Sequence, residues 1–389
     1  MNLKKYTYSK QELDRNDINA VIKTLNGELI TQGNKIKNFE KSLSSKFGSK
    51  YCIAVSSGTA ALHLAGFALN WQEGDIILTS PITFLASSNA ALYHKCTPEF
   101  VDIEDQTYTI DCNKLEDKIK QIKKRNKVVK SVIGVDYAGH PCDWNSLKYL
   151  SNKYEFTLIN DNCHSIGSKY NNLSSYASKY ADIVTQSYHA VKNITTGEGG
   201  AVLTNNKKFE KKIKLLRSHG VSKSSDLSKK FGRWYYSMEE LGYNYRLTDF
   251  QAALGTSQLK KLDNIILKKN KIASYYNSIF AKYDQFKTPV TKKNCLHSYH
   301  LYPLQFEFKK KKINKKNFFN YLAKKNIFLQ VHYIPIYKQP YYKKKFNYKI
   351  NSFPVSESFY NNSFSLPIYK SLLKNDLDYI TKTILKYTI

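Results

Sequence analysis

The stretch YCIAVSSGTAALHLAGFAL, residues 51–69, joins a short β-rich apolar run to a small polar turn and an apolar helical pattern. Its first five residues predict a strand and residues 59–69 predict a helix, which together form the βα unit of an α/β protein. The same alternation continues along the chain. Further strands are predicted at residues 75–80, 98–103, 131–135, 156–160, 183–187 and 201–204. We expect a mostly parallel sheet of seven or eight strands with helices on both faces.

The last two predicted strands are separated only by YHAVKNITTGEGG, residues 188–200. This segment is rich in Gly and Thr, and no helix fits it comfortably. An irregular connection between two apolar strands is a common place for binding and catalytic residues. We therefore treat residues 188–200 as a candidate functional loop.

The C-terminal third differs in composition from the rest of the chain. From about residue 260 the sequence is rich in Lys, Tyr, Phe and Asn, and we predict a large domain at residues 1–259, with an N-terminal arm, and a smaller α+β domain at residues 260–389. The run KKKKINKK at residues 309–316 precedes a helical pattern at residues 318–325. Because no arginine accompanies this run, we interpret it as a solvated turn and helix start rather than a nucleic-acid patch.

The charge balance is strongly basic. The 389 residues include 61 Lys+Arg against 31 Asp+Glu, a net charge of +30. Such an excess is typical of proteins that bind nucleic acid, anionic membranes or acidic ligands. Only five of the basic residues are arginines, and Asn, Ile, Tyr and Phe are also abundant, which favours a composition-wide bias. We predict no nucleic-acid and no membrane partner, and a dedicated polyanion surface is the alternative.

The cysteines and the N-terminal segment indicate the compartment. The six cysteines show neither CxxC nor zinc-finger spacing, so we predict neither a disulfide framework nor a metal site. The N-terminal MNLKKYTYSKQELDRND is polar, and no later stretch approaches the roughly 18 apolar residues of a membrane span. We expect a soluble, cytoplasmic protein.

Polar residues at the ends of the predicted strands suggest a cofactor site, because ligands of open α/β sheets bind beyond the carboxyl ends of the strands. Residues 56–59, SSGT, open a helix and form a candidate phosphate cup, although Ser and Thr are also ordinary helix caps. Asp161 follows a strand and would either hold a cationic heterocycle or cap a turn. Lys192 lies in the candidate functional loop, where desolvation lowers the pKa of an amine. A phosphate cup, a carboxylate and a buried lysine together predict a site for pyridoxal 5'-phosphate.

Two other cofactor classes lack their motifs. GEGG at residues 197–200 is not followed by Gly-Lys-Ser/Thr, and no GxGxxG fingerprint occurs in the chain. Kinase and dehydrogenase interpretations therefore lose their main support.

At these residues the chain resembles the DegT/StrS family of sugar-nucleotide aminotransferases, which have the type I fold of pyridoxal-phosphate enzymes. The resemblance covers nearly the whole length in several independent blocks in the right order. The blocks are ITQG (30–33), SSGTAALHLA (56–65), PITFLAS (81–87), DYAGHPCD (136–143), DNCHSIGS (161–168), SYHAVKNITTGEGGAVLT (187–204), RSHG (217–220), LGYNYRLTDFQAALG (241–255), HLYP (300–303), VHYIPIY (331–337) and SLP (365–367).

The resemblance implies roles for individual residues. Lys192 matches the lysine that holds the cofactor as a Schiff base and acts as the catalytic acid and base, and Asp161 matches the partner of the pyridine nitrogen. The remaining matches in the cofactor site are His164 near the ring's 3-hydroxyl, Gly58, Thr59 and Ser187 in the phosphate cup, Phe84 stacked on the ring, and Asn244 reaching the phosphate from a neighbouring subunit. The resemblance thus implies a homodimer with shared active sites. His332 and Tyr333 are candidates for lining the substrate site, with a structural role as the alternative for each.

Two positions depart from the commonest family pattern. Asn160 stands where Glu or Asp often precedes the ring-binding aspartate, and Asn193 stands where Pro often follows the lysine. Neither change removes a reacting group. Because Lys192 is present, the chain does not resemble the minority branch that replaces this lysine with histidine and performs sugar dehydration.

The resemblance also implies the substrates. Residues 136–143, 187–204 and 331–337 are most similar to the branch of the family that aminates the C4 keto group of a UDP-linked 4-keto-6-deoxy-N-acetyl sugar for pseudaminic acid, with L-glutamate as donor. Perosamine-like, legionaminic-like and 3-keto branches are the alternatives. A non-enzymatic regulator or nucleic-acid binder on this fold, suggested by charge alone, is the rival from another class, and a pyridoxal-dependent sugar dehydratase is a third.

Overall fold

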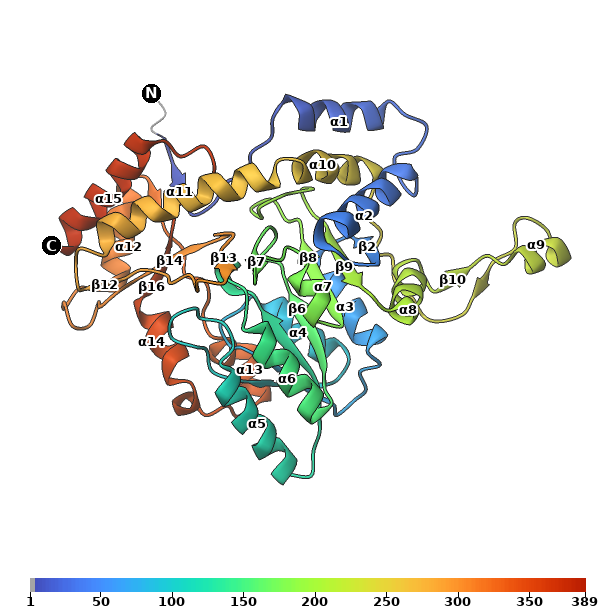
Figure 1. Ribbon diagram of the computed structural model, residues 1–389, viewed down its shortest axis with the longest axis horizontal. Coiled ribbons are helices and arrows are strands. Elements are labelled where there is room, and N and C mark those ends of the chain that lie inside the picture. Colours follow the sequence, from blue (N-terminus) through green and yellow to red (C-terminus); the bar gives the residue numbers. More distant parts are fainter. Residues whose placement is uncertain (1–3) are drawn as a thin grey trace.

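The computed structural model describes residues 4–389, with a seven-stranded sheet at the centre of the molecule (Figure 1). The strand order is β2-β9-β8-β6-β5-β3-β4. These strands are β2 (Tyr51–Val55), β3 (Ile76–Thr79), β4 (Thr97–Phe100), β5 (Val129–Val135), β6 (Thr157–Asp161), β8 (Ile183–Ser187) and β9 (Gly200–Thr204). Only β9 runs antiparallel to its neighbours β2 and β8, and every other neighbouring pair is parallel. All seven predicted strands therefore lie in one mostly parallel sheet.

Helices cover both faces of this sheet because its strands are apolar on both sides. In β2, Cys52 and Ala54 pack into one core, whereas Ile53 and Val55 pack into the other. The first core also contains buried residues of α2 (Asn34–Phe47), α5 (Cys112–Lys124), α6 (Trp144–Tyr154), α7 (Tyr176–Tyr180) and α10 (Asp249–Leu259). The second contains buried residues of α3 (Gly58–Ala68), α4 (Leu85–Tyr93) and α8 (Lys207–Arg217). A parallel sheet buried in this way explains the continuous apolar runs in the sequence.

A few predicted boundaries are wrong at the ends of elements. The strand predicted at residues 98–103 is β4, Thr97–Phe100, because Val101 and Asp102 already lie in the loop that follows. Asp161, predicted to follow its strand, is the last residue of β6. The helix predicted at residues 318–325 is α12, Lys315–Lys324, whose start is capped by Asn314.

The C-terminal region forms a second, smaller sheet of antiparallel strands, in the order β12 (Phe286–Lys287), β14 (Tyr302–Phe306) and β16 (Ser363–Leu366). Its core includes residues of α11 (Leu262–Phe280), α12 and α15 (Lys374–Thr388). Residues of α11 pack into both the large and the small core, and β1 (Tyr6–Thr7) pairs with β15 (Ile327–Phe328). The division at residue 259 stays a prediction, and α11 joins the two cores across it.

The remaining elements are short. They are α1 (Arg15–Leu25), β7 (Lys169–Tyr170), β13 (Cys295–Leu296), α13 (Pro340–Lys345), α14 (Pro354–Asn362) and the 3-10 turns η1 (Tyr137–Gly139), η2 (Ile336–Lys338) and η3 (Ile350–Ser352). A narrow arm with β10 (Val221–Ser222), α9 (Ser225–Phe231) and β11 (Ser237–Met238) extends away from the body (Figure 1). Within residues 4–389 no helix is long and apolar enough to cross a bilayer.

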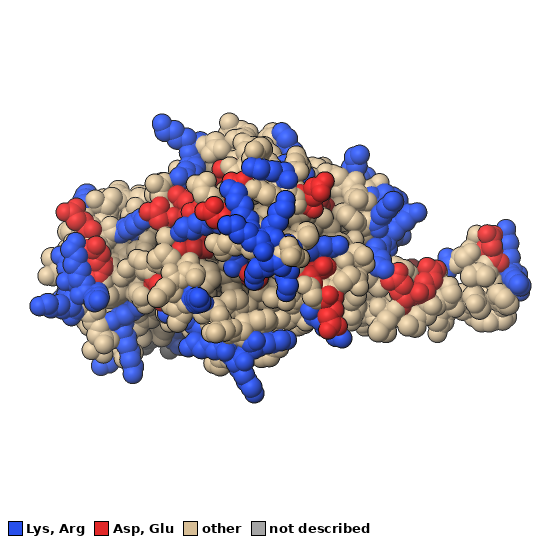
Figure 2. Space-filling model, turned by 90° about the horizontal axis from the view of Figure 1, so that it is seen from below, with Lys and Arg blue, Asp and Glu red and all other residues tan. Residues whose placement is uncertain are grey.

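The basic side chains are distributed rather than gathered. Figure 2 shows Lys and Arg spread over the whole of one face, with acidic residues among them. The residues of the lysine run at 309–316 are mostly exposed, as expected for a solvated turn and helix start. The six cysteines are free thiols.

Candidate active site

A cavity of about 660 Å³ opens at the carboxyl ends of the central strands, where β6 ends at Asp161 and β8 ends at Ser187. Nine of the ten predicted site residues line it: Gly58, Thr59, Phe84, Asp161, His164, Ser187, Lys192, His332 and Tyr333. The topology of the sheet brings them together although 275 positions separate the first from the last. The exception is Asn244.

The N-terminus of α3 forms one end of the cavity. The side chain of Ser57 accepts a hydrogen bond from the Ala60 N–H at 3.1 Å and caps the helix. Within residues 4–389 no hydrogen bond uses the N–H groups of Gly58 and Thr59, which are the first two of the helix. Free N–H groups at a helix N-terminus attract an anion.

Gly58 is required for the packing of this end. A Cβ atom at Gly58 would lie 2.8 Å from Ser187 Cβ and 3.3 Å from Cys163 Sγ. Ser187 and Cys163 line the same cavity. A side chain at position 58 would therefore push against the wall that carries Ser187.

Asp161 is nearly buried, with 5% of its surface exposed. Its Oδ2 accepts a hydrogen bond from Ser87 Oγ at 2.7 Å, and its Oδ1 accepts one from the Cys163 N–H at 3.2 Å. Two donors hold the carboxylate in one orientation facing the cavity.

Lys192 lies in the predicted irregular connection between β8 and β9. Its backbone N–H donates to the His189 carbonyl at 2.9 Å, so the chain turns sharply there. Burial lowers the pKa of the Lys192 amine, and the charges of Cys163 and Asp161 act against this shift. A lysine whose pKa is lowered supplies the neutral amine that nucleophilic and proton-transfer roles require.

His164 is held in one tautomer. The Ala138 N–H donates to its Nδ1 at 3.3 Å, so the proton of the neutral ring is on Nε2, which lies 3.0 Å from the Tyr333 hydroxyl. Burial lowers the pKa of His164 well below its ordinary value, and the nearby charge of Lys192 lowers it further. The ring is therefore a neutral donor beside Tyr333.

The two residues predicted to line the substrate site differ in their contacts. His332 is buried, its Nδ1 lies 2.8 Å from Ser365 Oγ, and its carbonyl accepts a hydrogen bond from the Tyr137 hydroxyl. Tyr333 faces Phe84 across the cavity with ring centroids 6.0 Å apart. Phe84 is 55% exposed, which leaves its ring free to contact a bound molecule.

Asn244 lies outside the cavity of this chain. It is exposed and forms an isolated antiparallel bridge with Ser218. Its predicted contact with a neighbouring subunit stays a prediction.

The sequence analysis missed three residues of the site. Ser87 lies in the PITFLAS block three positions after Phe84, one helical turn along α4, and this spacing was the available signal. His300, in the HLYP block, has Nε2 3.5 Å from Lys192 Nζ, and its Nδ1 has no hydrogen-bond partner within residues 4–389. Tyr8 packs its ring edge-on against His332, and nothing in the local sequence of the N-terminal arm indicates this contact.

These residues fit pyridoxal phosphate. The free N–H groups of α3 suit its phosphate, the fixed carboxylate of Asp161 suits a protonated pyridine nitrogen, and the buried amine of Lys192 suits its aldehyde. Residues 4–389 contain no group of three or more His, Cys, Asp or Glu side chains arranged to bind a metal ion.

Comparison with known proteins agrees with this chemistry. The profile of the DegT/DnrJ/EryC1/StrS aminotransferase family matches residues 11–385. The chain is 38% identical over 379 residues to the UDP-4-amino-4,6-dideoxy-N-acetyl-beta-L-altrosamine transaminase of Campylobacter jejuni, which covers 97% of this chain and 96% of that protein.

Solved structures extend the similarity to the whole fold. Helicobacter pylori PseC, an aminotransferase involved in the biosynthesis of pseudoaminic acid, matches with a TM-score of 0.89, 34% identity and 99% coverage of each chain. The putative sugar aminotransferase Spr1654 from Streptococcus pneumoniae, at 27% identity, matches in its PMP form with a TM-score of 0.89 and in its PLP form with 0.88, and each match covers at least 99% of both chains. The predicted type I fold, activity class and cofactor are confirmed. The chain belongs to the DegT/DnrJ/EryC1/StrS aminotransferase family and is a pyridoxal-phosphate-dependent nucleotide-sugar aminotransferase.

Proposed function

We propose that this protein transfers the amino group of L-glutamate to the C4 keto group of a UDP-linked 4-keto-6-deoxy-N-acetyl sugar, on the route to pseudaminic acid or a related surface glycan. The observation that carries the chemistry is a half-buried Lys192, whose amine has a pKa lowered by desolvation and faces the same cavity as Asp161 and the N-terminus of α3. The similarity to the Campylobacter and Helicobacter proteins, which extends over nearly the full chain, supports the choice of sugar.

The residues of the cavity divide the work of holding the cofactor. Bound pyridoxal phosphate supplies an electron sink that stabilises negative charge on the carbon being aminated or deaminated. Gly58, Thr59 and Ser187 would hold its phosphate, and Asp161, oriented by Ser87, would keep the ring nitrogen protonated. Phe84 would contact the ring of the cofactor, and His164, whose Nε2 carries a proton, would supply a donor for its 3-hydroxyl.

Lys192 has two tasks in this proposal. It would anchor the cofactor covalently at rest and be released when the amine of L-glutamate takes its place. The freed Nζ would then carry the proton to and from the donor carbon and, in the second half-reaction, to and from the sugar carbon. A general base of this kind works best when its pKa lies near the working pH, and burial moves the pKa of Lys192 in that direction. His300, 3.5 Å away, lies where it can orient the free amine.

We also propose that the working unit is a homodimer in which Asn244 completes the phosphate site of the partner subunit. Large apolar side chains are exposed on α1 and on the arm, among them Ile18, Ile22, Trp234 (80% exposed) and Met238 (62% exposed). Apolar surface of this kind is typical of a protein–protein interface. The exposed position of Asn244 near the base of the arm agrees with a role outside its own cavity.

The test is a coupled measurement of both half-reactions. Purified protein is incubated with 15N-labelled L-glutamate and a UDP-linked 4-keto-6-deoxy-N-acetyl sugar, and the sugar is analysed by mass spectrometry and by NMR at C4. We expect the label at C4 with wild type and none with Lys192→Ala, while Lys268→Met, an exposed lysine of α11, retains activity.

The same assay decides among the alternatives. Labelling of a GDP-linked 4-keto-6-deoxyhexose in preference to the UDP sugar favours a perosamine-like function, and labelling at C3 favours a 3-keto branch. Release of a ketodeoxysugar without consumption of glutamate favours the dehydratase. A protein that binds no pyridoxal phosphate but binds random DNA in a salt-dependent way is the non-enzymatic rival.

A further inference from the structure

Asn193, which directly follows Lys192, lies at a junction of three segments beneath the active site. Its Nδ2 donates to the Ile166 carbonyl at 3.1 Å and to the Ser298 carbonyl at 3.4 Å. Its Oδ1 accepts a hydrogen bond from Lys269 Nζ at 2.8 Å. One amide thus connects the Lys192 loop to three other parts of the chain.

The segments reached by this amide carry other groups of the site. Ile166 is two residues after His164, and Ser298 is two residues before His300. Ser298 is itself tied to the first of these segments, because its Oγ donates to the His164 carbonyl at 3.0 Å. The side chain of Asn193 therefore fixes the spacing between Lys192 and the two histidines beside it.

The two carbonyls and Lys269 together determine which way the amide faces. The carbonyls only accept hydrogen bonds, so the NH₂ group of Asn193 faces them, and its oxygen then faces Lys269, whose amine donates to it. Rotating the amide by half a turn would set its oxygen against two carbonyl oxygens and turn its NH₂ group toward the N–H groups of Lys269. One orientation therefore satisfies all three contacts.

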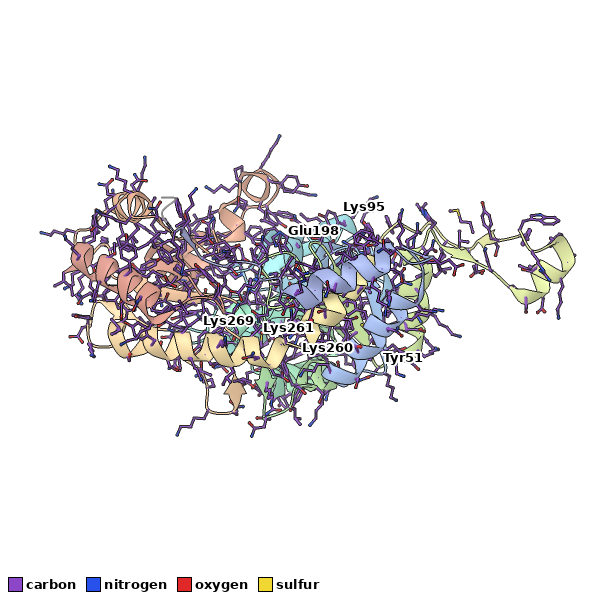
Figure 3. The ribbon with its side chains drawn as sticks, turned by 90° about the horizontal axis from the view of Figure 1, so that it is seen from above. Tyr51, Lys95, Glu198, Lys260, Lys261 and Lys269 are labelled. Atoms are coloured by element: carbon purple, nitrogen blue, oxygen red, sulfur yellow. The ribbon has the colours of Figure 1, made fainter. Side chains whose placement is uncertain are left out.

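The burial of Lys269 is unusual and calls for a reason. Lys269 lies on α11, further along the helix from Lys261 (Figure 3), and is only 3% exposed. Within residues 4–389 its amine makes no ion pair with a carboxylate. Burial lowers its pKa to about 7, so the position is costly for a lysine. An apolar residue would avoid this cost but would leave the Asn193 oxygen without its donor.

We propose that Lys269 and Asn193 are a positioning pair that holds the Lys192 loop in register with His164 and His300. This inference rests on the role of Lys192 in the proposed function. Asparagine lacks the ring with which a proline after Lys192 would restrain the backbone. Here the restraint comes from side-chain contacts, with α11 as the support.

The first test uses apo-protein and does not depend on activity. The loop has backbone hydrogen bonds that report its order, from the Lys192 N–H to the His189 carbonyl at 2.9 Å and from the Thr196 N–H to the Tyr188 carbonyl at 3.0 Å. Hydrogen exchange of residues 188–200 is followed by mass spectrometry. We expect Lys269→Met and Asn193→Ala each to speed exchange of these amides about tenfold or more.

Three further variants make the result specific. Lys268→Met, which changes an exposed neighbour on the same helix, should exchange as wild type. Asn193→Asp keeps an acceptor for Lys269 but sets a second oxygen against the Ile166 and Ser298 carbonyls, so it should loosen the loop as Asn193→Ala does. The double variant Lys269→Met, Asn193→Ala should be no looser than Asn193→Ala alone, because Lys269 acts on the loop only through Asn193.

The second readout is the rate at which apo-protein captures pyridoxal phosphate, measured by the growth of its visible absorption band. If Lys269 and Asn193 position the loop, the rate of cofactor capture should be several-fold lower in Lys269→Met and in Asn193→Ala. It should be unchanged in Lys268→Met. If the amides of residues 188–200 exchange at the wild-type rate in Lys269→Met, or if the effects of the two substitutions add in the double variant, Lys269 and Asn193 are not a positioning pair. If wild type captures no cofactor, the proposed function fails, whereas the exchange experiment still decides on the pair. Should Lys269→Met expose amides throughout the sheet, Asn193→Asp, which keeps the lysine, provides the decisive comparison.

Discussion

Replacing Gly58 with alanine tests the phosphate end of the site. The added Cβ would lie 2.8 Å from Ser187 Cβ, about 0.6 Å short of the 3.4 Å at which ordinary contact begins. Both neighbours are held in place. Ser187 is the last residue of β8, and the backbone N–H of Cys163 donates a hydrogen bond to the carboxylate of Asp161. Overpacking of this kind costs about 1 to 3 kcal/mol. The strain falls on the wall that would contact the phosphate.

We expect Gly58→Ala to raise the dissociation constant of pyridoxal phosphate by about tenfold, since about 1.4 kcal/mol corresponds to a factor of ten. The assay is titration of apo-protein with the cofactor, read by absorbance. Because Ser187 is itself proposed to hold the phosphate, Gly58→Ala is also made in a Ser187→Gly background, where the nearer clash is gone and the alanine should lower the affinity less than it does in wild type. Wild-type affinity in Gly58→Ala would refute the reasoning, because the wall would then accommodate the added methyl group without strain.

Ser87→Ala removes the hydroxyl that donates to Asp161, and loss of a hydrogen bond to a charged group, worth about 1.5 to 3 kcal/mol, should weaken cofactor binding at least about tenfold in equilibrium dialysis. The buried carboxylate of Asp136 accepts several hydrogen bonds, and Asp136→Asn would turn an NH₂ group, itself a donor, toward these donors. We expect the free energy of unfolding, from urea titration, to fall by about 2 to 4 kcal/mol. Burial lowers the pKa of Lys192, which reacts as a neutral amine, so the rate of cofactor capture measured by stopped flow should rise with pH and level off below pH 10.5. A rate that still rises beyond that value contradicts a lowered pKa for Lys192. Asn244→Ala should weaken cofactor binding while sedimentation still shows a dimer, and unchanged affinity would remove Asn244 from the site.

The sequence was sufficient to predict the large sheet because its strands are local signals. Each is a short apolar run bounded by turn residues, and burial on both faces makes such runs continuous. The ends were less accurate, as in β4, because hydrogen bonding to neighbouring strands decides where pairing stops. The segment at residues 188–200, interpreted from the sequence as a candidate functional loop, also carries the antiparallel reversal into β9, which was not predicted.

The site was partly predictable for the same reason. Asp161 ends β6 and Lys192 lies in the loop after β8, so the chain order already placed them at one edge of the sheet. Ser87 contacts Asp161 and His300 contacts Lys192, each far away in the sequence, so no local pattern indicates either contact. From the sequence, Asn193 was interpreted only as a departure from Pro that removes no reacting group. Its three hydrogen bonds could not be predicted, because they depend on segments more than 25 positions away.

The wall of the cavity opposite the sheet shows how the C-terminal region takes part in the chemistry. Gln330 and His332 are bound to Ser365 of β16, through a backbone hydrogen bond of 2.8 Å and a side-chain contact of 2.8 Å. On the other side, Tyr137, which follows β5, donates to the His332 carbonyl. The segment is thus attached to the small sheet and to the large sheet at the same residue. Because Tyr333 comes next and reaches His164, the two sheets together determine the position of the His164 ring in the wall of the cavity.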